Sequence, residues 1–533
     1  MDEIGSGLRQ REGLWELVVR SLRSIGALMF YCPAQLFLWG ICFFWAERAV
    51  AAPVDFSYVE KMAEELSRKP HQPPSVHSSL AGLSYDDYRM IRFNADKALW
   101  RGQALFEAQF FHLGFLFSVP VRIFEVDGEK VQEISYSRDF FTFDPRVEKK
   151  VNGTKIEKFA GLKITHPLHK ADVYDDVAVF LGASYFRLVG REDQFGLSAR
   201  GLAVDTAEPR GEEFPYFSHY WLVKPRAGDT YLTLYALLDS ASVAGAYSFL
   251  IHPGQQTSVD CQATLYPRDQ SRKMGIAPLT SMFLRGEADA RDQGDYRPEV
   301  HDSDVLLMLT GTSKEWIVRP LIRRGEGVRV TRYLDINPKG FGLVQRDRRY
   351  ENYLDLETHY ENRPDFWIAP KGPWGAGSVE LVEIASKFES NDNVVAYWVP
   401  QDTVDRPLKL KYRITAGRDA VNSDVAQVKR TLSQSLAETE FSTADEEKIA
   451  RRYLVDFSGS ELKGLGANQP LHPNLFLSKG SFRNLTIQKD ELTGDWRVVF
   501  VAIRDVDTAV DMRLTLTLRG ETLSETWFYL WDE

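Results

Sequence analysis

Short runs that alternate apolar and polar residues dominate the chain after about residue 105. They include FEAQFFHLGFLFSVPVRIFEV (106–126), DTYLTLYALLDS (229–240), GAYSFLIHP (245–253) and SVDCQATLYPRD (258–269). Alternation of this kind, rich in aromatic and β-branched residues and broken by Gly, Pro and Asp, predicts β-strands. Helical periodicity is limited to one modest stretch, Tyr58–Ser67, and Tyr85–Trp100 is interpreted as a turn that continues as a strand. No internal repeat is visible, so we expect an all-β fold built on a large antiparallel β-sandwich.

A polar stretch that is poor in aromatic residues, Ala416–Glu447, interrupts this pattern. Beyond it lie further strand candidates, among them RRYLVDFSG (451–459), WRVVFVAIRD (496–505), DMRLTLTLRG (511–520) and SETWFYLWD (524–532). Roughly a hundred residues with this spacing of strands favour an immunoglobulin-like sandwich, although the cysteine pair of such domains is missing. We therefore expect a first β-sandwich over residues 52–416, a linker over 417–430 and an immunoglobulin-like domain over 431–533.

The N-terminus has the order of a secretory signal. Ser24–Ala46 carries no charge and is mostly apolar, Arg20 and Arg23 precede it, and the small residues Ala49-Val50-Ala51 follow. A basic region, an apolar region and a small-residue cleavage site predict a signal peptide over residues 1–51. Because the apolar run could nearly span a bilayer, an uncleaved membrane anchor stays open as the alternative.

The three cysteines agree with an exported chain that folds without disulfides. Cys32 and Cys42 lie in the predicted signal, so only Cys261 remains after cleavage and no internal disulfide can form. Cys261 alternates with polar neighbours in SVDCQATLY, which favours a buried strand cysteine over a nucleophile.

Charge and composition narrow the classes of partner. The chain has 65 Lys and Arg against 75 Asp and Glu, a net charge of −10, so it is poorly suited to hold nucleic acid by counterion release. Aromatic residues make up 12% of the chain, which suits both strands and carbohydrate surfaces. Signatures of phosphate loops, zinc proteases and serine hydrolases are absent, and the 10 His are scattered. We expect no metal and no cofactor.

Two acidic loops are candidates for chemistry. In DYRPEVHDSD (295–304), Glu299, Asp302 and Asp304 surround His301, and FESNDNVVAYW (388–398) carries Glu389 and Asp392. Cleavage of a glycosidic bond needs one protonated and one ionised carboxyl group. The residues alone leave two alternatives open: both loops are solvated turns, or Asp302 and Asp304 bind calcium, for which the other ligands of an EF-hand loop are missing.

The stretch Gln345–Gly375 is dense in Arg, Tyr and Trp. Its candidates for contacts with a sugar are Arg346, Arg348, Tyr360, Arg363, Trp367 and Trp374. Such residues stack on sugar rings and bind hydroxyl groups in a groove, but an aromatic stripe also occurs in a core, and the sequence leaves both possibilities open.

At these same segments the chain resembles the periplasmic glucan biosynthesis proteins OpgG and OpgD, also called MdoG and MdoD. The strings that carry the resemblance include FLGASYFRLVG, FGLSARGLAVDTAEPRGEEFP, DYRPEVHDSD, NPKGFGLVQRDR, HYENRP, PKGPWGAGSVELVEI and NDNVVAYW. The resemblance implies a galactose-mutarotase-like sandwich followed by an immunoglobulin-like domain, in the periplasm. It also implies a role with osmoregulated glucans, which have a β-1,2-linked backbone and are made by an inner-membrane glucosyltransferase.

Residue by residue, the resemblance makes Asp392 the general acid and Asp302 the general base of an inverting endo-glucanase or a transglycosylase. Glu389 would assist the proton route and Tyr360 would contact the sugar. Asp302 and Asp392 are far apart in sequence, so only the fold could bring them together. The alternative is a glucan-binding or carrier protein without catalysis, and the sequence does not choose between the G and D branches.

Overall fold

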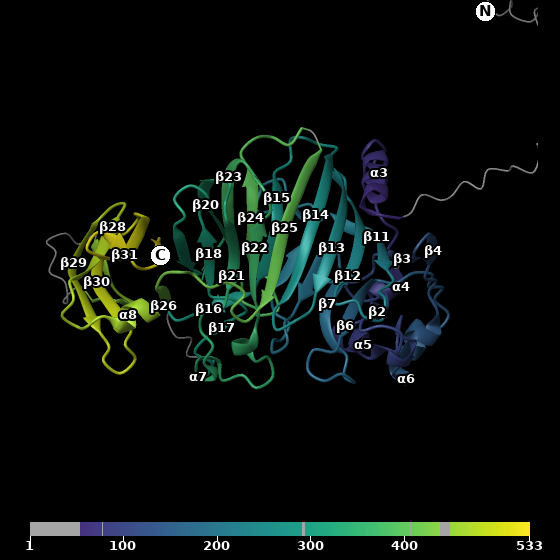
Figure 1. The fold of residues 1–533 in the computed structure, drawn as a ribbon, viewed down its shortest axis with the longest axis horizontal. Coiled ribbons are helices and arrows are strands. Elements are labelled where there is room, and N and C mark those ends of the chain that lie inside the picture. Colours follow the sequence, from purple (N-terminus) through teal and green to yellow (C-terminus); the bar gives the residue numbers. More distant parts are fainter. Residues whose placement is uncertain are drawn as a thin grey trace, which may run out of the picture. The chain divides into compact units, whose positions relative to one another are not determined.

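The computed structural model describes residues 54–76, 78–289, 294–323, 325–405, 407–437 and 448–532 (Figure 1). The predicted signal over residues 1–51, with Cys32 and Cys42, lies outside these ranges. Strands account for 48% of the described residues and helices for 10%, which confirms the all-β prediction. Within the described ranges, no helix combines the length and apolar content needed to cross a membrane.

One large sheet of the described residues has ten strands. In spatial order they are β2 (Glu107–Phe111), β6 (Gly161–His166), β7 (Asp175–Leu181), β8 (Tyr185–Leu188), β9 (Ser198–Arg200), β15 (Met274–Ser281), β24 (Val394–Pro400), β23 (Ala376–Ile384) and β20 (Val328–Ile336), with β10 (Leu202–Val204) also paired to β15. Neighbouring strands of this sheet run antiparallel, as the alternating pattern predicts.

A second sheet of the described residues has fifteen strands. In order they are β28 (Leu471–Leu477), β31 (Val510–Leu518), β33 (Thr526–Trp531), β19 (Trp316–Pro320), β18 (Val305–Leu309), β21 (Gly340–Val344), β22 (Asp365–Pro370), β25 (Leu408–Gly417), β14 (Thr257–Pro267), β13 (Val243–His252), β12 (Leu232–Asp239), β11 (Tyr216–Val223), β3 (Arg122–Asp127) and β4 (Lys130–Glu133), with β32 (Glu521–Thr522) on β31. Parallel pairing of β19 with β33 joins the last hundred residues to this sheet.

Smaller elements complete the described fold. A four-stranded sheet contains β26 (Gln427–Ser435), β27 (Lys448–Ser458), β30 (Trp496–Asp505) and β29 (Ser481–Lys489), and the two-stranded sheets are β1 (Ile91–Phe93) with β5 (Phe141–Phe143) and β16 (Phe283–Arg285) with β17 (Val300–His301). The helices are α3 (Phe56–Ser67), α4 (Ser78–Ala81), α5 (Tyr85–Arg89), α6 (Pro145–Val151), α7 (Tyr350–Tyr353) and α8 (Ser460–Gly464), and the 3₁₀ turns are η1 (Ala95–Lys97), η2 (Arg138–Phe140) and η3 (Tyr360–Asn362).

Near the start of the described chain, the structure confirms one local prediction and corrects another. The prediction at Tyr58–Ser67 is confirmed by α3, which begins slightly earlier because the Asp55 carboxylate caps it by accepting from the Tyr58 N–H. The interpretation of Tyr85–Trp100 is wrong at its start: residues 85–89 form helix α5, whose first turn is closed by a reciprocal capping box of Ser84 and Asp87.

The main hydrophobic core lies between the ten-stranded and the fifteen-stranded sheet. Phe180 and Phe186, on β7 and β8 of the first sheet, each place their ring centroid 5.3 Å from that of Phe249 on β13 of the second. Cys261 on β14 belongs to this core and is 3% exposed, as predicted for a structural cysteine. Burial raises the pKa of its thiol, so it is unreactive.

A second core packs the four-stranded sheet against β31 and β33. Tyr453 on β27 lies 5.4 Å from Phe500 on β30 and 6.1 Å from Trp527 on β33, measured between ring centroids. The Trp527 indole N–H donates to the Thr431 hydroxyl at 2.9 Å. β25 ends at Gly417 and β26 begins at Gln427, inside the range predicted as a linker. The predicted domain ranges and their immunoglobulin-like and mutarotase-like types stay predictions.

We expect Glu525→Ala to lower the free energy of unfolding by about 3–5 kcal/mol, because it leaves a buried charge unpaired. The fully buried Glu525 carboxylate accepts from the Arg346 guanidinium at 2.7 Å and from the Val428 N–H at 2.8 Å. Denaturant unfolding measures the loss. Glu521→Ala, on an exposed strand position, is the matched control; equal effects of the two variants would contradict the prediction.

Candidate functional site

Asp302 lies directly after strand β17, where that strand pairs with β16. Its backbone N–H donates to the Met282 carbonyl at 2.8 Å, and its carboxyl forms an ion pair with the Arg363 Nε at 3.0 Å. Asp302 is 8% exposed. Burial raises the pKa of this carboxyl and the charge of Asp392 adds to the rise, whereas Arg363, Arg187 and His301 oppose it.

Asp392 lies in the loop between β23 and β24. Its neighbour Asn393 fixes this loop: the Asn393 amide accepts from the Phe283 N–H at 2.8 Å and donates to the Phe283 carbonyl at 2.9 Å and the Ile384 carbonyl at 3.0 Å. Asp392 is exposed to solvent, at an open hollow whose lining includes Arg187, Ser386, Ser390 and Asn391. Although its surface is open, the surrounding protein raises the pKa of Asp392, against the lowering effect of Arg187 and Arg200.

The structure therefore brings the two acids to the same segment of backbone, Ser281–Phe283. The Ser281 carbonyl accepts from the Asn393 N–H at 3.0 Å, the Met282 carbonyl accepts from the Asp302 N–H, and Phe283 pairs with His301 across β16 and β17. Arg187 lowers the pKa of both acids, and Asp392 raises that of Asp302, so their carboxyl groups act on one another electrostatically.

Tyr360, Glu389 and Arg363 join the same group. The Tyr360 hydroxyl donates to the Glu389 carboxylate at 3.3 Å, and the Arg363 guanidinium lies 5.2 Å from the Tyr360 ring centroid. Arg297 donates to Glu389 at 2.7 Å. Burial raises the pKa of the Tyr360 hydroxyl, with further contributions from the charges of Glu389 and Asp302. Tyr360 therefore keeps a neutral hydroxyl, which donates to Glu389.

The structure does not bring Arg346, Trp367 and Trp374 to this group. Arg346 is bound to Glu525, and Trp367 on β22 places its ring 5.7 Å from that of Trp316. Trp374 packs on the main core, with its ring 6.3 Å from that of Trp398 and 5.9 Å from that of Tyr412. Arg348, from the same stretch, binds the Asp365 carboxylate at 2.6 Å. These four side chains pack or form ion pairs away from Asp302, whereas Tyr360 and Arg363 of the same stretch lie beside it.

Sequence reasoning missed the residues that surround Asp392. Arg187 is exposed between the buried residues Phe186 and Leu188 of β8, so alternation along the strand directs it away from the core. Tyr185, under the guanidinium of Arg200 at 4.5 Å, has a pKa that burial raises to about 12, with a contribution from the charge of Asp392. The only signal was that Tyr185 and Arg187 fall in the matching string FLGASYFRLVG.

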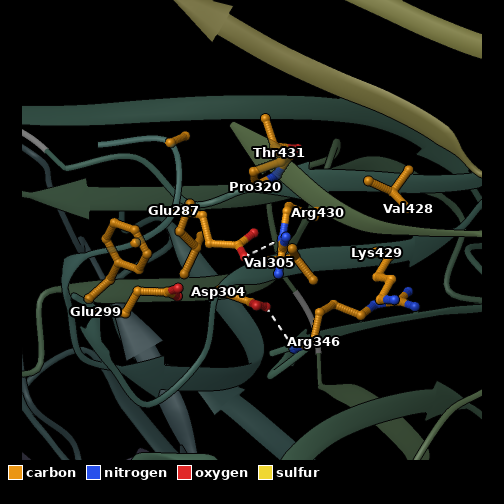
Figure 2. A pocket seen from close by; sticks show the side chains of 14 residues that line it. Glu287, Glu299, Asp304, Val305, Pro320, Arg346, Val428, Lys429, Arg430 and Thr431 are labelled. Carbon is orange, nitrogen blue, oxygen red and sulfur yellow. Dashed lines mark hydrogen bonds and ion pairs between the residues drawn. The ribbon is translucent and has the colours of Figure 1, made fainter. Parts of the chain in front are cut away.

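Three carboxylates near the site could suggest a metal. Ligand atoms of Glu287, Glu299 and Asp347 lie within 4.8 Å of one another, beside a small cavity of about 40 Å³ that Figure 2 shows from close by. Each, however, has a cationic partner: Glu287 binds Arg430 at 2.8 Å, Glu299 binds His301 at 2.9 Å, and Asp347 binds Arg349 at 3.2 Å. Burial and the neighbouring carboxylates raise the pKa of Glu287 to about 9. These contacts describe a hydrogen-bonded network of acidic and basic groups in which Glu287 holds a proton at neutral pH.

Fold and site together define an all-β protein whose sheets hold an acidic pair beside a tyrosine and several arginines. The chain belongs to the family described as periplasmic glucan biosynthesis protein, MdoG, whose sequence model matches residues 54–531. The resemblance seen in the sequence is thereby confirmed, and the family description implies the periplasm. Among solved structures, the Slr1438 protein from Synechocystis sp. PCC 6803 is similar at 5% identity, over 48% of this chain and 91% of that chain, with a TM-score of 0.17. A likeness this weak carries no argument.

We expect Asn393→Ala to lower the free energy of unfolding by about 1–3 kcal/mol, because buried backbone groups of Phe283 and Ile384 lose their partners. Denaturant unfolding tests this. The control is Asn391→Ala, an exposed position in the same loop whose amide reaches only the Ser386 hydroxyl, at 3.4 Å. A loss no larger than that of the control would show that Asn393 does not anchor the loop.

The raised pKa of Asp392 predicts a pH-dependent change in stability. Since the folded-state pKa lies above the unfolded value, ionisation of this carboxyl costs folding free energy, and that cost appears as the pH rises through the folded pKa. Asp392→Asn cannot ionise. We therefore expect it to raise the thermal unfolding midpoint relative to wild type more at about pH 7.5 than at about pH 4. A gain that is independent of pH would contradict the assignment.

Proposed function

We propose that the chain acts on a β-1,2-linked glucan in the periplasm, with Asp392 as general acid and Asp302 as general base. The glucan would come from an inner-membrane glucosyltransferase. The observation that carries the proposal is the convergence of both acids on the backbone of Ser281–Phe283, although they lie far apart in the sequence. Family membership supports the substrate class.

The different surroundings of the two acids support the division of roles. Asp302 contacts a cation, Arg363 at 3.0 Å, which favours its ionised form. Burial raises the pKa of both carboxyls, but within the described residues only Asp302 contacts a cation, whereas the Asp392 carboxyl makes no hydrogen bond or ion pair. A base must be ionised and an acid must hold a proton before the bond breaks.

In an inverting hydrolysis, Asp302 takes a proton from water as the water oxygen bonds to the anomeric carbon. The bond from that carbon to the glycosidic oxygen breaks, and Asp392 gives its proton to the departing oxygen. Tyr360 and Arg363, which lie beside Asp302, would bind hydroxyl groups of the sugar. A transglycosylase would use the same acids with a sugar hydroxyl in place of water.

We expect Asp392→Asn to slow turnover of linear β-1,2-glucan by about 10²–10⁴-fold, because the leaving oxygen loses its proton donor. New reducing ends and chain-length distributions of the products measure the effect. Asp402→Asn, at an exposed position beyond the other end of β24, is the matched control and should leave turnover unchanged.

The same assay separates the alternatives. A change in chain lengths without a rise in reducing ends would show transfer. The two acids would then keep their roles, and a transglycosylase would replace the hydrolase as the proposed function. Binding of the glucan with unchanged chain lengths in the wild type would refute catalysis and leave a carrier as the function. Undiminished cleavage by Asp392→Asn would refute the role of this acid.

A further inference from the structure

We propose that His301 is a permanently charged imidazolium beneath the site, and that it acts as a positioning residue that keeps Asp302 ionised. The second half of this inference rests on the proposed function, because it assigns Asp302 the role of base. The first half concerns the protonation of one buried side chain and stands on geometry alone.

Both ring nitrogens of His301 face oxygen atoms. The ring is fully buried; its Nε2 lies 2.9 Å from the Glu299 carboxylate and its Nδ1 lies 2.8 Å from the Gln345 Oε1. A neutral imidazole carries one N–H and one bare nitrogen, which needs a donor. The protonation state of His301 therefore depends on whether these two oxygens can only accept.

The orientation of the Gln345 amide is settled by its other contacts. Its Nε2 donates toward the His301 carbonyl at 3.2 Å and the Tyr360 carbonyl at 3.1 Å, and neither oxygen can donate. Its third neighbour is the Tyr353 hydroxyl at 2.8 Å, whose own proton goes to the Asp347 carbonyl at 3.0 Å. The Gln345 Oε1 must therefore face His301, and the Nδ1 of His301 must carry a proton.

The second nitrogen shares its proton with Glu299. Burial and the charges of Asp347 and Asp304 raise the pKa of Glu299, so they oppose its ionisation, whereas the bond to His301 favours it. On the side of His301, the charges of Glu299 and Asp304 favour the protonated ring. Asp304 belongs to the same loop, and Glu287 and Asp347 lie close to Glu299 from other elements. The cations that face this group, Arg346, Arg349 and Arg430, are each bound to a carboxylate.

An aromatic neighbour also favours a cation. The ring of Phe283 stacks on His301 with centroids 5.5 Å apart, so it offers its negative face to the imidazole. Burial by itself lowers the pKa of His301, but the bond to Glu299 and the charges of Glu299 and Asp304 outweigh burial and raise this pKa to about 9.

His301 ends β17 and Asp302 follows it directly, and the two side chains have different partners: Glu299 and Gln345 for His301, and Arg363 for Asp302. The imidazolium lies on the interior side, whereas Asp302 faces Arg363 and Arg187, and the positive charge of His301 lowers the pKa of Asp302. Through Gln345, His301 also holds the backbone of Tyr360. One buried cation therefore positions the base and the tyrosine beside it.

Nitrogen-15 NMR of the histidine-labelled protein tests the first half, with the His301 signal assigned by its loss in His301→Gln. We expect both ring nitrogens of His301 to be protonated at pH 7.5. An unprotonated Nε2 at this pH would place the proton on Glu299 and overturn the inference. The measurement needs no substrate, so it holds whether or not the chain is an enzyme.

The pH profile of kcat/KM on β-1,2-glucan tests the second half. His301→Gln should move the acidic limb upward by about one pH unit, because Asp302 loses a nearby positive charge, and should leave the alkaline limb in place. His169→Gln is the control and should move neither limb.

An unshifted acidic limb in a folded His301→Gln protein would overturn the positioning role. If that variant does not fold, Glu299→Gln replaces it, with an upward shift of the same limb expected because burial then favours the neutral form of His301. A wild type without activity would refute the proposed function and leave the NMR result standing.

Discussion

The candidate site depends on one short stretch of backbone, Ser281–Phe283, at the end of β15. Its carbonyl groups accept the N–H groups of Asp302 and Asn393, and Phe283 is bound again by the Asn393 amide. Because β15 lies inside the ten-stranded sheet, between β9 and β24, the segment cannot move independently of that sheet. The relative position of the two acids is therefore a property of the sheet, although both acids lie in loops.

The buried charged groups next to the site cost folding free energy, and packing alone does not explain why they are there. Glu299, His301 and Asp347 are all buried, and ions removed from water are costly even when they are paired. Apolar residues of similar volume would serve stability as well or better. The presence of this network is therefore better explained by a positioning role. The groups that it holds in place include the backbone of Tyr360 and the loop of Asp302.

The fold class could be predicted because alternation is a local signal. Pairing between distant strands is not local, so nothing in the sequence indicated that β19 would pair with β33. The short helix α5 was missed because its capping box, Ser84 with Asp87, resembles a turn when no long periodic run follows.

The candidate site could be predicted only in part, for a similar reason. Asp302, Asp392, Tyr360, Glu389 and Arg363 stood in acidic or matching strings, and the structure gathers them. Trp367 and Trp374 stood in a string that was equally suggestive, but in the structure they pack against other aromatic rings. Aromatic and charged residues alternate both in a groove and at the edge of a core, so this pattern cannot tell the two apart. Arg187 and Asn393 are single residues whose importance comes from the partners that the fold brings to them.

The asymmetry between the two acids links this architecture to chemistry. Asp302 is already shielded and contacts a cation, so a bound sugar would change its surroundings little. Asp392 is open to solvent and has only distant cations, so a sugar placed over it would remove water and raise its pKa further. Binding of substrate would then raise the pKa of Asp392 relative to that of Asp302, in the direction that a general acid and a general base require. Because the loops of both acids are hydrogen-bonded to Ser281–Phe283, this change would come from solvent exclusion and would need no movement of the backbone.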